Sequence, residues 1–283
     1  MVVVATSNAA HVPIARRAVE AGVPVVVDKP LAPDSESARG LVRLAEGAGV
    51  LLTVFHNRRW DNDFLTVRAL VASGRLGDVH RFESRFERWA PGLRQHSWRE
   101  DPDPRAGAGL LLDLGSHLVD QALLLFGPAV VVSAELDRRR PGSKVDDDVF
   151  ISLAHAGDVR SHLWASAMAP RAGPRFRVLG SEAGYVRYGL DPQEQQLKEG
   201  LRPGDAGWGA QPSEQDGTLG AGESAGVVPT APGAYETFYS ALVAALDGRA
   251  PPPVDPWDAV RVIETLEAAR RAAAGGRADV VGA

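Results

Sequence analysis

Short β-branched runs alternate with amphipathic stretches in the first 56 residues. Residues 2–6, 23–27 and 51–56 are apolar runs of strand length, which predict three buried strands. Residues 11–21 and 35–48 place their apolar side chains at helical spacing between these runs. The β-α-β-α-β order predicts a parallel sheet with right-handed crossovers.

The pattern changes after residue 59. Helices are expected over 64–73, 235–246 and 256–274, and a largely apolar, at least partly helical stretch over 110–126. Strands are expected over 79–89, 129–136, 148–154, 160–166, 175–179 and 185–188. Residues 190–233 are rich in Gly, Pro and Gln, and we interpret them as irregular. The short connections between consecutive strands predict a large, open, mostly antiparallel sheet.

Lys29 stands at the end of the second predicted strand, between Asp28 and Pro30. In open α/β sheets ligands bind in the crevice at the carboxyl ends of the strands, so Lys29 is a candidate functional residue. The competing interpretation is a solvated surface lysine beside an ordinary strand-ending proline.

Asp113 and His117 form a second candidate pair on the helix expected over 110–126. Four residues apart, they share a helix face with Asp120 and Gln121. A carboxylate beside an imidazole raises its basicity, which suits a general acid or base. A hydrogen-bonded core histidine, a capping aspartate, or a metal site formed with Asp120 are the alternatives.

Composition excludes several classes of protein. The chain has 283 residues and a formal net charge of −5, which argues against a nucleic-acid partner. Without cysteine it has neither disulfides nor thiolate chemistry. No apolar run is long enough to span a membrane, and the first residues lack the basic region of a signal peptide, so we expect a cytoplasmic protein.

Three motifs together resemble one enzyme family. The D-K-P that ends a strand, the D-x-x-x-H-x-x-D of residues 113–120 and the opening V-V-A-T-S-N-x-x-H resemble the Gfo/Idh/MocA oxidoreductases over essentially the whole chain. The resemblance implies an α/β fold in which residues 1–58 are the second half of a Rossmann dinucleotide-binding domain. Residues 59–283 are then an α+β substrate and oligomerisation domain.

Two segments look closer to one branch of that family. Residues 55–61 (F-H-N-R-R-W-D) and 188–194 (Y-G-L-D-P-Q-E) resemble the bacterial NADP-dependent scyllo-inositol dehydrogenases. This resemblance implies a polyol or sugar substrate, NADP or NAD as the cofactor, and a homodimer or homotetramer formed through the open sheet.

The resemblance also implies residue roles. Lys29 matches the lysine that hydrogen-bonds the reacting hydroxyl, and His117 matches the residue that takes its proton. Asp113 matches a carboxylate companion that also contacts substrate, while Tyr235 matches a pocket residue or simply begins a helix. The positions implied to lie near the cofactor are Thr6, Ser7, Asn8, His11, Asp28, Lys29, Pro30, Asn57, Trp98 and Arg99. Pro30 matches a proline often preceded by a cis bond.

Elementary chemistry agrees with these roles. Oxidising a secondary alcohol needs a base for the hydroxyl proton and a cation that stabilises alkoxide character. His117 and Lys29 supply these two groups. A redox carrier is also required because no side chain accepts hydride.

The sequence departs from the family at the phosphate-binding turn. No strand is followed by G-x-G-x-x-G, and Gly220-Ala221-Gly222 lies in the irregular stretch. If residues 2–6 are the fourth Rossmann strand, about 60 residues are missing, and we interpret the chain as N-terminally truncated by a misplaced start codon or as a fragment. A chain that is truly this short would bind dinucleotide poorly, and the rival hypothesis is a non-enzymatic sugar-binding or regulatory protein.

Overall fold

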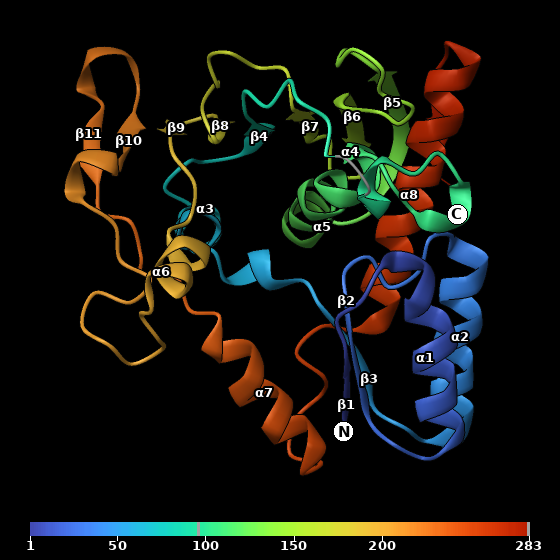
Figure 1. Ribbon diagram of the computed structural model, residues 1–283. Coiled ribbons are helices and arrows are strands. Elements are labelled where there is room, and N and C mark those ends of the chain that lie inside the picture. The colour runs from blue at the N-terminus through green and yellow to red at the C-terminus, as the bar shows by residue number, and fades with distance from the viewer. Residues whose placement is uncertain (95–96, 282–283) are drawn as a thin grey trace.

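The computed structural model describes residues 1–94 and 97–281, which form two sheets with helices around them (Figure 1). The smaller sheet has three parallel strands in the order β1 (Val2–Val4), β2 (Val25–Asp28) and β3 (Leu52–Phe55). Helices α1 (Asn8–Glu20) and α2 (Ser35–Ala48) lie together along one side of it (Figure 1). The prediction of a parallel Rossmann-type sheet is confirmed.

Local signals explain where α2 begins and ends. The Asp34 side chain accepts a hydrogen bond from the Ser37 amide at 2.7 Å and so satisfies a free donor of the first turn. Gly49 ends the helix in the left-handed region with φ of 64°, where residues with a Cβ are strained. These two residues place α2 between β2 and β3.

The larger sheet is open and mixed. Its order is β11-β10-β9-β8-β4-β7-β6-β5-β12, and among these neighbours only β4 and β7 run parallel. The strands are β4 (Val79–Glu87), β5 (Ala129–Asp137), β6 (Asp148–His155), β7 (Arg160–Ser166), β8 (Phe176–Gly180), β9 (Gly184–Arg187), β10 (Gly217–Gly220), β11 (Gly226–Val228) and β12 (Asp279–Val280). A large, mostly antiparallel sheet was the expected form.

Helices connect these strands, and some of them pack against the large sheet. They are α3 (Asn62–Ala72), α4 (Leu110–Asp113), α5 (Gly115–Phe126), α6 (Gln193–Glu199), α7 (Glu236–Leu246) and α8 (Pro256–Gly275). The single-turn 3-10 helices are η1 (Asn57–Trp60), η2 (Trp98–Glu100), η3 (Pro104–Ala106), η4 (Ser213–Gln215) and η5 (Gly222–Ser224). Within residues 1–94 and 97–281, no helix combines the length and apolar character needed to cross a bilayer.

The interpretation of residues 190–233 as irregular is wrong in part. This stretch contains α6 and the β10–β11 hairpin, which extends the large sheet beyond β9. Gly233 packs directly against the Gln193 side chain, because a Cβ at position 233 would lie 2.2 Å from the Gln193 Nε2 atom. Close packing between distant residues therefore orders a segment whose composition is typical of a loop.

Helix α8 belongs to the cores of both sheets. Val262 and Leu266 pack in the apolar cluster under the large sheet, whereas Val260 and Ile263 pack in the cluster under the small one. Phe238 of α7 also joins the second cluster. The C-terminal helices thus return to the first sheet, as the long course of α8 in Figure 1 shows, and they hold the two sheets together.

Candidate active site

Strand β2 places Lys29 at the edge of the small sheet that faces α4. Val25, Val26 and Val27 are buried, and the strand ends at Asp28, whose carboxylate accepts a hydrogen bond from the Lys29 amide at 2.8 Å. The Lys29–Pro30 peptide bond is cis. The lysine side chain therefore leaves the small sheet at its carboxyl edge, where ligands bind in such sheets.

Asp113 is the hydrogen-bond and ion-pair partner of Lys29. Lys29 Nζ donates to the Asp113 backbone oxygen and to its Oδ1 atom, each at 2.7 Å. Burial opposes ionisation of Asp113, but the charge and hydrogen bond of Lys29, together with the charge of Arg99, outweigh it and lower the Asp113 pKa. Lys29 and Asp113, two of the predicted site residues, are thus brought together as an ion pair.

The helix around Asp113 is interrupted. Helix α4 ends at Asp113 and α5 begins at Gly115, so the stretch 110–126 is mostly helical, as expected, with an interruption at Leu114. Asp146 Oδ2 accepts a hydrogen bond from the Leu111 amide at 2.6 Å and caps α4 from outside. The Asp113 side chain pairs with Lys29, and among the described residues no hydrogen bond joins it to His117.

His117 lies in the first turn of α5 and is 4% exposed. Its Nδ1 atom is buried and has no hydrogen-bond partner among the described residues. Burial first, and then the positive charges of Lys29 and Arg58, hold the pKa of His117 well below its usual value. The expectation that a carboxylate raises the basicity of His117 is therefore wrong, and its imidazole is neutral at pH 7.

Phe86 explains much of this environment. The Arg58 and Arg175 guanidinium groups stack on its ring at 4.7 Å and 3.9 Å, and its ring meets that of His117 at a centroid distance of 6.3 Å. Both arginines are anchored by buried aspartates, Asp61 and Asp63. Neither arginine was among the predicted site residues, because no sequence motif connects them with His117.

Four of the residues implied to lie near the cofactor are at the start of α1. Thr6 and Ser7 lie at the turn before α1, while the Asn8 side chain donates to the Gly107 oxygen at 2.8 Å. His11 is buried, with Nδ1 2.8 Å from the Pro30 oxygen. His11 therefore holds the backbone next to Lys29 and Asn8 holds that of Gly107, and contact of all four with a cofactor stays a prediction.

Trp98 and Arg99 approach the site from another segment. The Arg99 guanidinium stacks on Trp98 at 4.5 Å, and its Nε atom lies 4.0 Å from Asp113 Oδ2. Asn57 begins η1 immediately after β3 and is partly exposed. The structure thus brings Arg99 to Asp113, as expected of residues near one site.

Tyr235 contacts the buried Asp61. It precedes α7, is 7% exposed, and its hydroxyl donates to Asp61 Oδ1 at 2.8 Å. Its expected contact with substrate stays a prediction.

His56 is the functional candidate that sequence reasoning missed. Asp28 pairs with Phe55 across β2 and β3, so Lys29 and His56 leave neighbouring strands at the same edge. The His56 ring is 1% exposed, and its centroid lies 6.4 Å from that of His117. The signal was present, because His56 follows a buried parallel strand as Lys29 does.

Asp120 is held by an arginine. Arg59 donates to both of its carboxylate oxygens, with the shortest contact of 2.6 Å between Nη2 and Oδ1. Within residues 1–94 and 97–281, no group of three or more His, Cys, Asp or Glu side chains is arranged to hold a metal ion. The alternative of a metal site at Asp113, His117 and Asp120 thus has no geometric support.

Comparison with known proteins gives matches along the chain. Residues 1–56 match the family described as "Oxidoreductase family, NAD-binding Rossmann fold", and residues 68–281 match its C-terminal alpha/beta domain. The oxidoreductase YdgJ of Escherichia coli is 42% identical over 271 residues, which are 94% of this chain and 77% of YdgJ.

A curated relative and a solved structure from Bacillus subtilis are also similar. The scyllo-inositol 2-dehydrogenase (NADP(+)) IolW is 34% identical over 95% of this chain and 75% of its own length. The solved structure of yvaA superimposes with a TM-score of 0.93 at 32% identity, over 99% of this chain and 80% of yvaA.

Proposed function

The chain belongs to the Gfo/Idh/MocA oxidoreductase family, and from this premise we propose that it oxidises a secondary alcohol of a polyol or sugar, with inositols as the first candidates. The observation that carries the proposal is the ion pair of Lys29 and Asp113 at the carboxyl edge of the small sheet. The buried His117 lies near enough for the charge of Lys29 to lower its pKa. The name of the relative IolW supports an inositol and NADP.

His117 is the proposed base. Because its lowered pKa keeps the imidazole neutral, it can accept the hydroxyl proton at neutral pH. The substrate O–H bond breaks as an N–H bond forms on His117. In the reverse direction the same group returns the proton to the carbonyl oxygen.

Lys29 is the proposed electrostatic partner of the reacting oxygen. An ammonium group has three N–H donors, and two of them are directed to Asp113. The third is free to hydrogen-bond the substrate oxygen and to stabilise negative charge as the proton leaves. Asp113 fixes the ammonium group in place.

The donor set at this edge fits the nicotinamide end of NAD or NADP. Nicotinamide, when bound, supplies the hydride acceptor that no side chain provides. The unpartnered His117 Nδ1 atom and the third N–H donor of Lys29 are polar groups that can bind a ligand there. Thr6, Ser7, Asn57 and Arg99 are the proposed neighbours of the cofactor.

The test is reduction of NADP or NAD at 340 nm by the full chain with scyllo-inositol, myo-inositol and glucose. Calorimetry with each polyol, with and without nucleotide, is run in parallel. Turnover that is lost in His117→Asn supports the proposal. Polyol binding without turnover or nucleotide binding favours a non-enzymatic sugar-binding protein.

We also propose that the open face of the large sheet pairs with a second copy of the chain. Along β6 and β7, Phe150, His162 and Trp164 form a row of partly exposed rings, and the Arg85 guanidinium stacks on Trp164 at 3.8 Å. Alternation places these rings opposite the face that packs on α5 and α8. Next to these rings, arginine and glutamate side chains alternate along the neighbouring strand β4. A two-fold axis can therefore place opposite charges of two copies against each other.

A further inference from the structure

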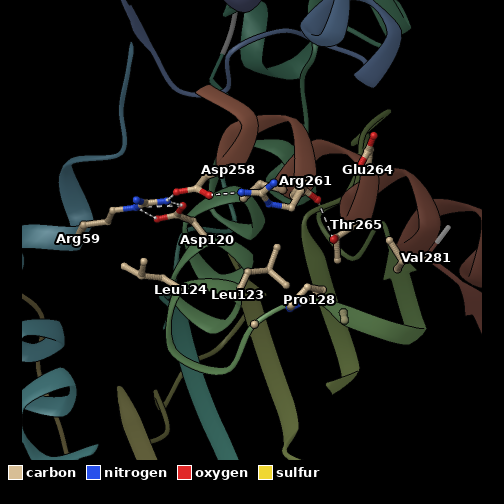
Figure 2. A pocket seen from close by; sticks show the side chains of 13 residues that line it. Arg59, Asp120, Leu123, Leu124, Pro128, Asp258, Arg261, Glu264, Thr265 and Val281 are labelled. Carbon is tan, nitrogen blue, oxygen red and sulfur yellow. Dashed lines mark hydrogen bonds and ion pairs between the residues drawn. The ribbon is translucent and has the colours of Figure 1, made fainter. Parts of the chain in front are cut away.

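A cavity is lined by Asp120, which lies one helical turn after His117 on α5, and by residues of α8 (Figure 2). Its volume is about 350 Å³, enough for on the order of ten water molecules. Its lining comes from η1, α5, the start of β5 and α8, and includes Arg59, Asp120, Asp258, Arg261 and Thr265. We call it the Asp120 cavity.

The charges in the Asp120 cavity are already paired. Arg59 contacts Asp120 and Asp258, and Arg261 contacts Asp258, as the dashed lines in Figure 2 show. Glu264 forms an ion pair with Arg39. A lining of paired charges and the Thr265 hydroxyl offers water several hydrogen bonds but offers an ionic ligand no uncompensated partner.

His56 stands between this cavity and His117. Its Nδ1 atom lies 3.9 Å from Asp120 Oδ2, and the two imidazole rings meet edge to face. The Nδ1 atoms of His56 and His117 are both buried without a hydrogen-bond partner among the described residues. Two adjacent unpartnered imidazoles, followed by a carboxylate that lines a cavity, form a row of proton acceptors.

We propose that His56 carries the proton away from His117 and delivers it, through Asp120, to water in the Asp120 cavity. This inference rests on the proposed function, in which His117 takes a proton from the substrate. Since His117 is 4% exposed, a substrate in front of it would leave the proton no open path on that side. A path behind His117 allows release while the site stays closed.

The transfers balance as proton movements alone. The N–H bond on His117 breaks as an N–H bond forms on His56, and the His56 proton then passes to Asp120 and to cavity water. Imidazole suits this role because it can bind a proton on one nitrogen and release one from the other. The gap of 3.9 Å is about 1 Å longer than a hydrogen bond, so the ring must move toward Asp120 for the transfer.

The charges around His56 and Asp120 favour release of the proton from these residues over its retention there. Burial lowers the pKa of His56, and Asp120 and Asp258 oppose this effect while Arg59 and Lys29 reinforce it. Although burial disfavours the Asp120 carboxylate, Arg59 outweighs it and holds the Asp120 pKa below its usual range. A proton that reaches Asp120 is therefore released to water.

The experiment measures exchange of the His117 imidazole N–H with water by NMR in the full chain labelled with ¹⁵N-histidine. His56→Asn and Asp120→Asn are each expected to slow this exchange by at least about tenfold. His80→Asn, an exposed site on β4, is the matched control and should leave the rate unchanged. Unchanged exchange in folded His56→Asn overturns the proposal.

A second measurement covers the case in which the variants do not fold. In the wild-type chain the His56 resonances must shift again as His117 titrates, because the two rings interact. Independent titration of the two rings contradicts the relay. Neither measurement uses substrate or nucleotide, so a chain without dehydrogenase activity can still show the relay, and an active chain can lack it.

Discussion

Lys29 Nζ lies 2.7 Å from Asp113 Oδ1 and at the same distance from the Asp113 backbone oxygen. The pair joins β2 of the small sheet to the end of α4 under the large one. Its side chains are 15% and 26% exposed, so the ammonium group is fixed but accessible. This geometry suits a group that receives a substrate oxygen.

Lys29→Met should abolish most of the turnover. The substitution keeps the length of the side chain but removes the charge and the free donor, so we expect the turnover number to fall by about 10²–10³-fold. Spectrophotometric assay with NADP and scyllo-inositol measures this effect. Lys198→Met, on the exposed surface of α6, is the control, and turnover of Lys29→Met close to that of the control would rule out the assigned role.

Local sequence was sufficient for much of the fold and for the centre of the site. The bounds of α2 were predicted correctly because Asp34 and Gly49 act within one turn of its ends. Lys29 was found because a buried parallel strand must end at the edge of the sheet. Both arguments use only neighbouring residues or the sheet geometry.

Other features depend on contacts that no local pattern reveals. The interruption after Asp113 lies against α8, since a Cβ on Gly115 would make a van der Waals contact of 3.4 Å with the Leu266 Cδ2 atom. The α6 and β10–β11 segment likewise depends on Gln193, whose side chain accepts from the Tyr235 amide at 2.9 Å. Such contacts link residues that only the complete fold brings together.

Tyr235→Phe should lower stability. Its hydroxyl donates to the buried Asp61 carboxylate, whose pKa is raised by burial, and removal of this donor leaves a carboxyl oxygen short of a partner. We expect the free energy of unfolding to fall by about 1–3 kcal/mol, measured by urea denaturation. Tyr239→Phe on the following helix α7, 47% exposed, is the control with a change within about 0.5 kcal/mol. An unchanged stability with weaker polyol binding would instead place Tyr235 in the substrate pocket.

Trp164→Glu should dissociate the proposed oligomer. A carboxylate in the row of rings on the open face would meet its own copy across a two-fold axis, where like charges repel. Light scattering after gel filtration should show a fall to the monomer mass. Leu197→Glu on α6, 48% exposed, is the control that should keep the wild-type mass. A wild-type chain that is already monomeric contradicts pairing through this face.

His117 should make stability depend on pH below neutrality. Burial lowers its pKa in the folded state, whereas the unfolded chain titrates near about 6.5. Between these two values the unfolded state binds more protons, so the free energy of unfolding decreases as the pH falls below about 6.5. The loss approaches about 1.4 kcal/mol per pH unit for each such group.

His56 and His155 contribute in the same direction, since burial lowers their pKa values too. His117→Gln should therefore reduce the slope of unfolding free energy against pH without removing it, as measured by urea denaturation at pH 7.5, 6.5 and 5.5. His80→Gln, at an exposed site, should keep the wild-type slope. If His117→Gln also keeps that slope, His117 is charged in the folded protein at acidic pH and cannot be the neutral base that alcohol oxidation requires.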